Sequence, residues 1–303
     1  MPKRMTPAIR KIEKRKSKLT TGTITSSPGK EAWRRFKRNK LAIVGGIIFL
    51  LLIFVGILAP VLAPEGFDYQ DYSATLRTPD AKYWLGTDMF GRSILSRIIW
   101  GARVSLPIGL LCCASNLVFG GILGSCAAFF SGKTDMIIMR ILDVFAAIPG
   151  ALMAIAIAAA LGTGMFNLIL AMTISYIPMF ARTVRAAVLT VKANDYIEAA
   201  NAVSASTLRQ ILVHMLPNAI GPVIVSATFN IASCILVVST LSYLGLGIAP
   251  PTPEWGSMLA AGRDHLRTSP YIILFPGFTI MLTVLSLNLF GDGLRDALDP
   301  RLK

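Results

Sequence analysis

Few residues of this sequence have the type and spacing that nucleotide binding, metal binding or nucleophilic catalysis requires. Ser131-Gly132-Lys133-Thr134 has the ending of a phosphate-binding loop, but Ala127 stands where that loop needs its first glycine, and no strand precedes it. We predict a short turn between two helices there. His214 and His265 are isolated, and neither an HExxH zinc motif nor a GxSxG nucleophile motif occurs. The sequence thus predicts no catalytic residue, no metal site and no cofactor bound by this chain, so any energy it uses must be delivered by another chain.

One polar segment, Asp195 to Pro217, has a shape suited to binding a partner. Asp195 and Glu198 have the spacing of a capping box, which begins a helix. Ser204-Ala205-Ser206 interrupts this helix, and Ser206 can cap a second one that Pro217 ends. Apolar or small residues share one face of each helix: Tyr196, Ala199, Ala200 and Val203, then Leu208, Ile211, Leu212 and Met215. Two short amphipathic helices favour docking into a groove of another protein; a loop resting on the bilayer surface is the alternative.

Composition places the rest of the chain in a membrane. Of its 303 residues, 54% are hydrophobic and 15% are charged, whereas a soluble domain is about 25% charged. Six stretches are apolar over the roughly 20 residues that a bilayer-spanning helix needs. They are residues 41–63, 103–130, 136–161, 166–190, 217–247 and 270–291. We therefore predict an all-α polytopic membrane protein with about six transmembrane helices.

The first 40 residues set the orientation of these spans. They hold fourteen Lys and Arg residues against Glu13 and Glu31, and Lys37-Arg38-Asn39-Lys40 directly precedes the first apolar stretch. Basic residues beside a first span keep that end in the cytoplasm, and this adjacency favours a membrane anchor over the alternative, an arm that binds nucleic acid. An even number of spans places the C-terminus in the cytoplasm as well. We therefore expect the chain to contact membrane lipid and not nucleic acid.

These assignments divide the chain into five parts. We predict a basic cytoplasmic tail (1–40), a first transmembrane helix (41–63), an extracytoplasmic loop (64–102), a five-helix core that contains the polar loop (103–291, with 195–217) and a cytoplasmic C-terminal tail (292–303).

The core helices are rich in proline and poor in charge. Each of the five stretches of the core contains an interior proline, at Pro107, Pro149, Pro178, Pro222 and Pro276. Each removes one helical hydrogen bond and bends its helix, which fits ordinary packing and helices that tilt around a pathway equally well. Asp143 follows Arg140 by three residues, so we expect these two to pair near the inner interface. The lack of a chain of buried acids disfavours a proton- or sodium-driven carrier.

Four ordered motifs carry a resemblance to one family of proteins. Glu198-Ala199-Ala200 followed by His214-Met215-Leu216-Pro217-Asn218 resembles the EAA loop of ABC importer permeases. Gly86-Thr87-Asp88-Met89-Phe90-Gly91-Arg92 is similar to the outer-loop signature of the oligopeptide/dipeptide/nickel permeases. The segments Leu244 to Gly256 and Asn288 to Pro300 resemble their last outer loop and their C-terminus, and Trp33 to Gly45 resembles the entry of the C-type subunit of such permease pairs.

Two positions depart from the pattern of that family. Ser204 stands between the two short helices of the EAA loop, where the family usually has Gly, which reaches positive φ without strain. Ser93 follows Gly91-Arg92 where the family usually has Asp. The first departure leaves the geometry of the turn open, and the second has no explanation in the sequence.

The resemblance implies a function. It implies the type I ABC importer transmembrane fold and a permease subunit of an ATP-driven, binding-protein-dependent importer of peptides or nickel chelates in the cytoplasmic membrane of a prokaryote. The implied partners are a homologous permease, two cytoplasmic subunits that use ATP, and an extracytoplasmic solute-binding protein. Asp195, Glu198, Ala199, Ala200, Ser204, His214 and Pro217 would form the ATPase-coupling loop. Residues 64–102 and 248–269 would receive the binding protein.

The competing hypothesis is a secondary carrier or channel that works alone. The basic tail, the six spans and the prolines fit it as well. The partner-shaped loop and the scarcity of buried ionisable residues stand against it. The sequence leaves the solute, whether dipeptide, oligopeptide, nickel or another chelate, undetermined.

Overall fold

The computed structural model of the chain describes residues 28–298, and this part is helical without a named strand. Most of the predicted basic tail and residues 299–303 lie outside the described residues. The elements are α2 (Pro28–Phe36), α3 (Lys40–Ile57), α4 (Ala59–Leu62), η1 (Tyr72–Ala74), α5 (Ile94–Phe130), α6 (Gly132–Ala146), α7 (Gly150–Leu161), α8 (Met165–Lys192), α9 (Asp195–Ala202), α10 (Thr207–Arg209), η2 (Gln210–Met215), α11 (Leu216–Tyr243), α12 (Trp255–Gly262), η3 (Arg263–His265) and α13 (Tyr271–Leu298).

The predicted number of spans is confirmed, with one of them broken. Within the described residues, five helical segments are long and apolar enough to cross a membrane, and α6 with α7 makes a sixth candidate that is bent by 78°. The continuous span predicted over 136–161 is therefore wrong at Pro149, which precedes the first residue of α7. Proline lacks an N–H and disfavours helical geometry at Ile148 before it, so the two helices separate there. The other four prolines lie inside continuous helices.

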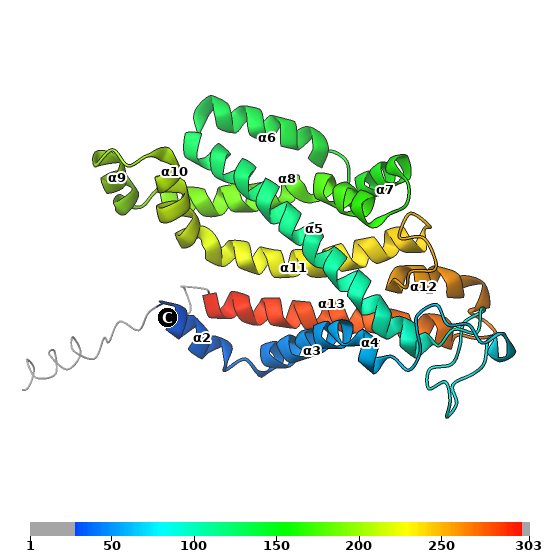
Figure 1. The fold of residues 1–303 in the computed structure, drawn as a ribbon. Helices are drawn as coiled ribbons and strands as arrows, with labels where there is room; N and C mark the ends of the chain where they lie inside the picture. Colours follow the sequence, from blue (N-terminus) through cyan, green and yellow to red (C-terminus); the bar gives the residue numbers. More distant parts are fainter. Residues whose placement is uncertain (1–27, 299–303) are drawn as a thin grey trace, which may run out of the picture.

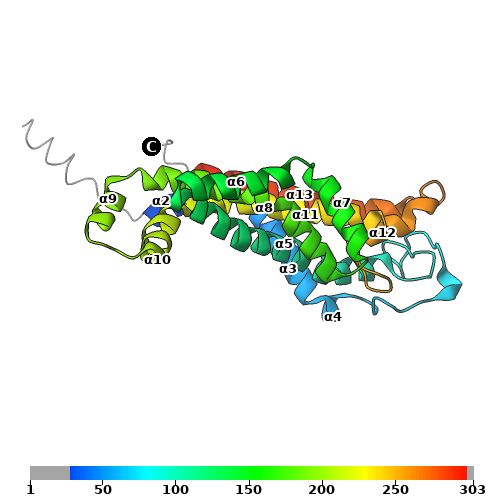
Figure 2. The same ribbon diagram turned by 90° about the horizontal axis from the view of Figure 1, so that it is seen from above.

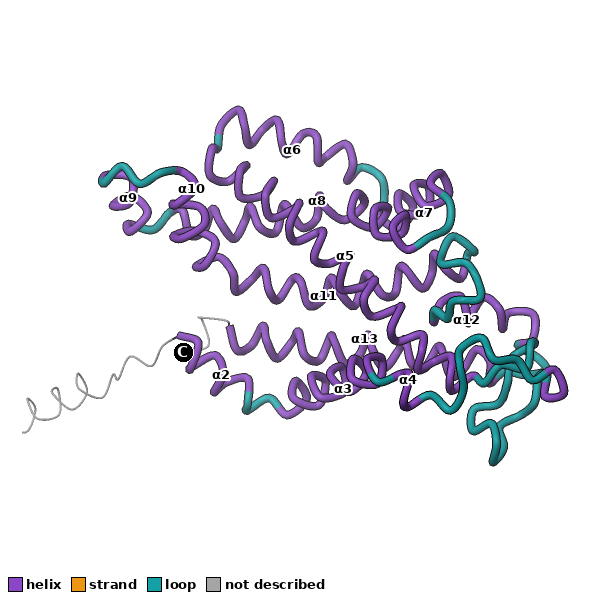
Figure 3. Tube along the Cα trace, in the orientation of Figure 1, coloured by secondary structure: helices purple, strands orange, loops and turns teal. Residues whose placement is uncertain are grey.

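The long helices form an elongated bundle with distinct ends. In Figure 1, α5 crosses diagonally over α8 and α11, while α3 runs alongside α13. Viewed from above, α9 and α10 project beyond one end of the bundle, and α12 lies at the other (Figure 2). We call the end with α2, α9 and α10 the inner end, in keeping with the predicted orientation. The longest loops gather at the opposite, outer end (Figure 3), where residues 63–93 and 244–270 form what we call the outer cap.

The first span packs against the last through small residues. A Cβ atom on Gly45 would lie 2.6 Å from the carbonyl oxygen of Ser286, and one on Gly293 would lie 2.0 Å from Cβ of Ala42. Such close approach of backbones is how helices associate in lipid, where the hydrophobic effect between them is absent. At the start of α3, Asn39 caps the helix by accepting from the Ala42 amide at 3.1 Å. The first span is thereby fixed to the core.

Candidate docking sites at the two ends of the bundle

The polar segment at the inner end, residues 195–217 (the inner loop), begins with helix α9. A capping box with Asp195 as the N-cap predicts that the helix begins at Tyr196, but Asp195 is itself the first residue of α9, so the helix begins one position earlier than predicted. Ile197 and Ala200 are buried against the bundle, whereas Glu198 and Ala199 are exposed. Of the small residues expected on a contact surface, Ala200 therefore packs into the chain's own core. The outward face carries Glu198 and Ala199.

A left-handed residue ends α9. Ser204 has φ of +55°, the conformation that glycine adopts without strain and a serine adopts at a cost of roughly 1 kcal/mol. The Ala205 amide donates to the Ala200 carbonyl at 3.1 Å, which is the bond that defines a Schellman helix end. The serine therefore keeps the turn geometry that the resemblance assigns to glycine.

The second helix of the inner loop does not end at Pro217. Ser206 precedes α10 as expected, but its side chain makes no capping hydrogen bond. The helix continues from α10 through the π-helical turn η2 into α11, so Thr207–Tyr243 forms one candidate span, with Pro217 at the start of α11. A π turn shifts the hydrogen-bond pattern by one residue, so the helix can pass a proline that lacks an N–H. The predicted stop at Pro217 is wrong for this reason.

The inner end presents apolar side chains. Met215 is 1% exposed, but Leu208 and Leu212 of the same predicted face are 67% and 53% exposed. Val213 and Val203 are exposed as well. Exposed apolar residues gathered around a loop are typical of a protein-interaction surface.

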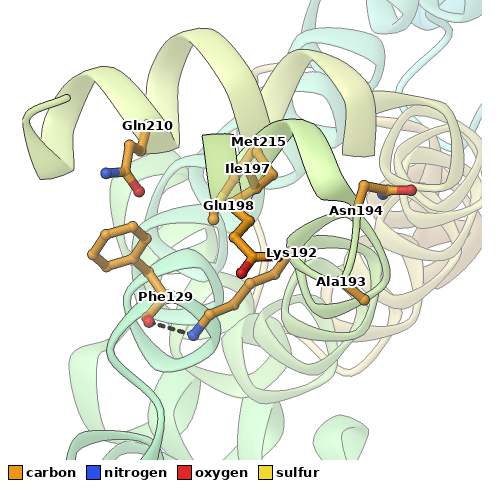
Figure 4. Close-up of a pocket in the computed structure, with 8 residues that line it drawn as sticks. All are labelled: Phe129, Lys192, Ala193, Asn194, Ile197, Glu198, Gln210 and Met215. Carbon is orange, nitrogen blue, oxygen red and sulfur yellow. Dashed lines mark hydrogen bonds between the residues drawn. The ribbon is translucent and has the colours of Figure 1, made fainter. Parts of the chain in front are cut away.

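A cavity of about 500 Å³ lies between α9, η2 and the inner end of α8. Figure 4 shows Glu198 and Lys192 side by side at its edge, with Gln210 facing Phe129 across it. Lys192 Nζ donates to the carbonyls of Ala128 and Phe129 at 3.0 and 2.6 Å. These are terminal carbonyls of α5, where a cation is favourable. Sequence reasoning missed the role of Lys192.

His214, on η2, is half-buried, and its carbonyl accepts from the Asn218 side chain at 2.7 Å.

Two ion pairs join α6 to α8. Asp143 pairs with Arg182 at 2.8 Å, not with Arg140 as predicted. Asp135 accepts two hydrogen bonds from Arg185, at 2.6 and 2.5 Å. The prediction was wrong because helical spacing indicates which residues share a face of one helix, whereas an arginine on the neighbouring helix reaches the same carboxylate. As predicted, a short turn joins two helices here: Ser131 lies between α5 and α6, and residues 132–134 form the first turn of α6.

The outer-loop motif forms a tight, buried turn in the outer cap. Gly86 and Gly91 have φ of +79° and +70°. Asp88 accepts from the amides of Phe90 and Arg92 and pairs with the Arg92 guanidinium at 2.7 Å. Thr87 is fully buried, and its hydroxyl accepts from an amide of the neighbouring loop segment at 2.9 Å. Five residues of this motif are buried and shape the outer cap rather than presenting side chains to a partner: Gly86, Thr87, Asp88, Gly91 and Arg92.

The structure explains the serine at position 93. Ser93 is the N-cap of α5, and its hydroxyl accepts from the Ser96 amide at 3.3 Å. Serine and aspartate are both good N-cap residues, so Ser93 and the Asp of the family can both cap this helix.

Arg97, one turn into α5, donates to the carbonyls of Phe67 and Pro251 at 3.2 and 3.4 Å. A basic residue near the N-terminus of a helix is unfavourable by itself. The position of Arg97 in the sequence therefore indicates that its side chain binds groups outside the helix.

Glu254 and Trp255 fix α12 to α5. Both side chains are fully buried, and the Trp255 indole donates to the Ile98 carbonyl at 3.0 Å. The Glu254 carboxylate caps α12 by accepting from the amides of Gly256 and Ser257 at 2.9 and 2.8 Å. Burial raises the pKa of the Glu254 carboxyl, and these donors act in the opposite direction. Both parts of the outer cap are thus anchored to the first residues of α5.

Comparisons with known proteins identify the family. Residues 117–303 match the model of the binding-protein-dependent transport system inner membrane component, and residues 27–79 match the N-terminal TM domain of oligopeptide transport permease C. The dipeptide transport system permease protein DppC of Alkalihalophilus pseudofirmus is 44% identical over 277 residues, which cover 91% of each chain. The di/tripeptide transport system permease protein DppC of Pseudomonas aeruginosa is 44% identical over 283 residues, 91% of this chain and 93% of the relative.

Two further similarities agree with this result. The glutathione transport system permease protein GsiD of Pectobacterium atrosepticum is 43% identical over 278 residues, 91% of this chain and 92% of the relative. The inward-facing structure of the MetNI methionine ABC transporter aligns with a TM-score of 0.56 at 16% identity, over 68% of this chain and 98% of that chain. That structural likeness confirms the type I importer fold. The chain therefore belongs to the family of binding-protein-dependent transport system inner membrane components, as a multi-pass inner-membrane permease of the ABC importer class.

Proposed function

We propose that this chain is one of two homologous permease subunits in an importer of short peptides. The relatives named above are permeases for dipeptides, di- and tripeptides and glutathione, and their similarity extends over about nine tenths of this chain. These names favour peptides over the nickel chelates that the sequence left open. The complete importer would add two cytoplasmic ATPase subunits and an extracytoplasmic solute-binding protein.

The observation that carries the coupling role is the surface of the inner loop. Glu198 and Ala199 of α9 are exposed, and so are the apolar side chains of Leu208 and Leu212 in the second helix of the same loop. A surface that carries a carboxylate and apolar groups suits a groove that offers a cation and a hydrophobic wall. We propose that this groove belongs to the ATPase. Asp195, Ser204, His214 and Pro217 would then hold the surface in shape, since they lie in the two helices and the turn that carry it.

Energy would enter through this surface alone. Residues 131–134 follow α5, a helix, whereas a phosphate-binding loop follows a strand. We therefore propose that the chain is not an enzyme, that it binds no cofactor, and that ATP is used by the partner. ATP binding can move this loop only if ATP binds one arrangement of the ATPase pair more tightly than the other, because a ligand shifts an equilibrium by the difference in its affinity for the two states.

A charge reversal tests the docking role. Glu198→Lys should abolish recovery of the ATPase subunit with the tagged permease and should abolish ATP-dependent uptake of a radiolabelled dipeptide, while membrane insertion is unchanged. Asp292→Lys is the matched control, because Asp292 is an exposed acid of α13 outside the inner loop and outside the segments expected to receive the binding protein. Unchanged uptake in Glu198→Lys would refute the docking role. A permease that transports peptide without any ATPase subunit would instead be a stand-alone carrier.

A further inference from the structure

One exposed stripe of α8 differs in chemistry from the exposed faces of α3 and α5. Met179, Arg182, Ala186 and Thr190 are exposed and follow each other at intervals of three or four residues, so they lie along one side of the helix. The stripe therefore combines a thioether, a guanidinium, a methyl group and a hydroxyl.

The faces of α3 and α5 show what a lipid-facing surface of this protein looks like. On α3 the exposed side chains include Leu50, Phe54 and Ile57, and on α5 they include Val118 and Ile122. All of these are large and apolar, as contact with acyl chains requires. The stripe of α8 lacks this composition, which indicates a different environment.

The ion pair on this stripe also fits poorly with hydrocarbon. Arg182 lies ten residues before the end of α8, which is roughly 15 Å along the helix axis. Its side chain and that of Asp143 are 47% and 50% exposed although they pair at 2.8 Å. Ionisable groups within membrane segments almost always face a bundle interior or a water-filled cavity. Facing lipid, this half-exposed pair would be expensive.

The pair retains capacity for a further anion. Arginine has five N–H donors, and one bond, from Arg182 Nη2 to Asp143 Oδ1, holds this guanidinium. Arg140 is exposed one turn before Asp143 on α6, and it takes no partner among the described residues. Two guanidinium groups thus accompany one carboxylate. This surplus of positive charge and free donors suits a carboxylate, which guanidinium binds in a bidentate manner.

We propose that the α8 stripe lines the solute pathway and that Arg182, held by Asp143, binds the carboxylate of the passing solute. The identity of that solute as a peptide rests on the proposed function, because every unblocked peptide carries a C-terminal carboxylate. In this arrangement Asp143 is a positioning residue, and Arg140 adds positive charge beside the pair.

Thiol labelling tests whether the stripe faces water. Inside-out membrane vesicles that carry the complete importer are treated with the charged, membrane-impermeant sulfonatoethyl methanethiosulfonate. Ala186→Cys in the stripe should be labelled at least roughly tenfold faster than Val118→Cys on α5, because hydrocarbon excludes a charged reagent. The chain without an added cysteine gives the background from its natural cysteines. Equal, slow labelling of the two variants would overturn the proposal, since the stripe would then face lipid or be covered by a subunit.

Uptake tests the carboxylate role. Arg182→Gln should lower the rate of dipeptide uptake roughly tenfold, the effect of losing one charge-assisted hydrogen bond. Arg182→Lys should recover part of that loss, because lysine keeps the charge but cannot form the bidentate contact. Recovery of the ATPase with each variant reports assembly. Full uptake in Arg182→Gln, or an equal loss in both assembled variants, would overturn the role of the charge. A failure of the proposed function is distinguishable, because the wild-type chain would then show no ATP-dependent peptide uptake while labelling of Ala186→Cys would be unaffected.

Discussion

The amide of Ala205 donates a hydrogen bond to the carbonyl of Ala200, five residues earlier, and this bond ends helix α9. The bond forms because Ser204, between the two, has φ of +55° and turns the chain back over the last helical turn. The direction in which the chain leaves α9, and therefore the placement of α10 beside it, depends on this single left-handed residue.

We expect Ser204→Gly to keep the inner loop intact and Ser204→Val to loosen it. Valine is β-branched and disfavours positive φ, so Ser204→Val should cost about 1–2 kcal/mol of local stability, whereas glycine relieves the strain. Limited proteolysis of the inner loop in inside-out vesicles measures this. Ser206→Val is the matched control, because Ser206 has an extended backbone that valine adopts readily. Equal protease sensitivity of the two valine variants would contradict the role assigned to Ser204.

Much of the fold is predictable from apolar runs, because lipid requires each span to be a helix with internally satisfied hydrogen bonds. The helix ends are less predictable. Helix α5 begins at Ile94 inside the predicted outer loop, and α13 runs to Leu298 inside the predicted tail. Both helices are longer than the apolar run from which the span was predicted, so hydropathy does not detect their ends. The break at Pro149 and the continuity through Pro217 show that the presence of a proline does not by itself predict where a helix ends.

The candidate sites divide in the same way. Local signals predict local features, such as the interruption at Ser204 and the turn at Ser131. Contacts between distant segments, such as Asp143 with Arg182 or Lys192 with the end of α5, depend on how helices cross. A single sequence contains no direct measure of that crossing.

We expect Lys192→Met to destabilise the junction of α5 and α6. Lys192 Nζ donates to two terminal carbonyls of α5 and to the Ser131 hydroxyl at 2.8 Å. Losing these charge-assisted bonds should cost about 1.5–3 kcal/mol. Thermal unfolding of the purified importer measures the effect, and Lys133→Met is the control because Lys133 is exposed and takes no partner among the described residues. A similar melting temperature in both variants would argue against this capping role.

The cap at Ser93 predicts a graded series of variants. Ser93→Ala removes the acceptor of the Ser96 amide at the start of α5 and should cost about 1 kcal/mol. Ser93→Asp restores an acceptor and places a negative charge at a helix N-terminus, so it should match or exceed the wild type. Thermal stability of the three proteins should therefore rank alanine lowest. If Ser93→Ala were as stable as Ser93→Asp, the capping explanation of this position would be wrong.

Two glycines of α5 offer a paired test of the anchor between α5 and α12. A Cβ on Gly101 would lie 2.8 Å from Cδ1 of the buried Trp255 indole, whereas one on Gly121 would meet nothing within 4 Å. Gly101→Ala should lower the free energy of unfolding by about 1–3 kcal/mol through overpacking. Gly121→Ala should change it by less than about 1 kcal/mol. Tryptophan fluorescence during thermal unfolding follows both, and a destabilisation shared equally by the two would point to helix flexibility rather than to contact with Trp255.

The buried Glu254 carboxyl should make the stability of the outer cap depend on pH. Burial raises the pKa of the Glu254 carboxyl above 4.5 in the folded protein. Between pH 4.5 and the raised pKa, the folded state therefore binds more protons than the unfolded state does. Stability should accordingly rise as the pH falls through the raised pKa toward 4.5, and fall as the pH rises again. Glu254→Gln has no such proton, so the difference in melting temperature between wild type and variant should shift in favour of the wild type from pH 8 to pH 5. A difference that stays constant, or that shifts the other way, would mean that the amide donors of Gly256 and Ser257 outweigh the cost of burying the charge.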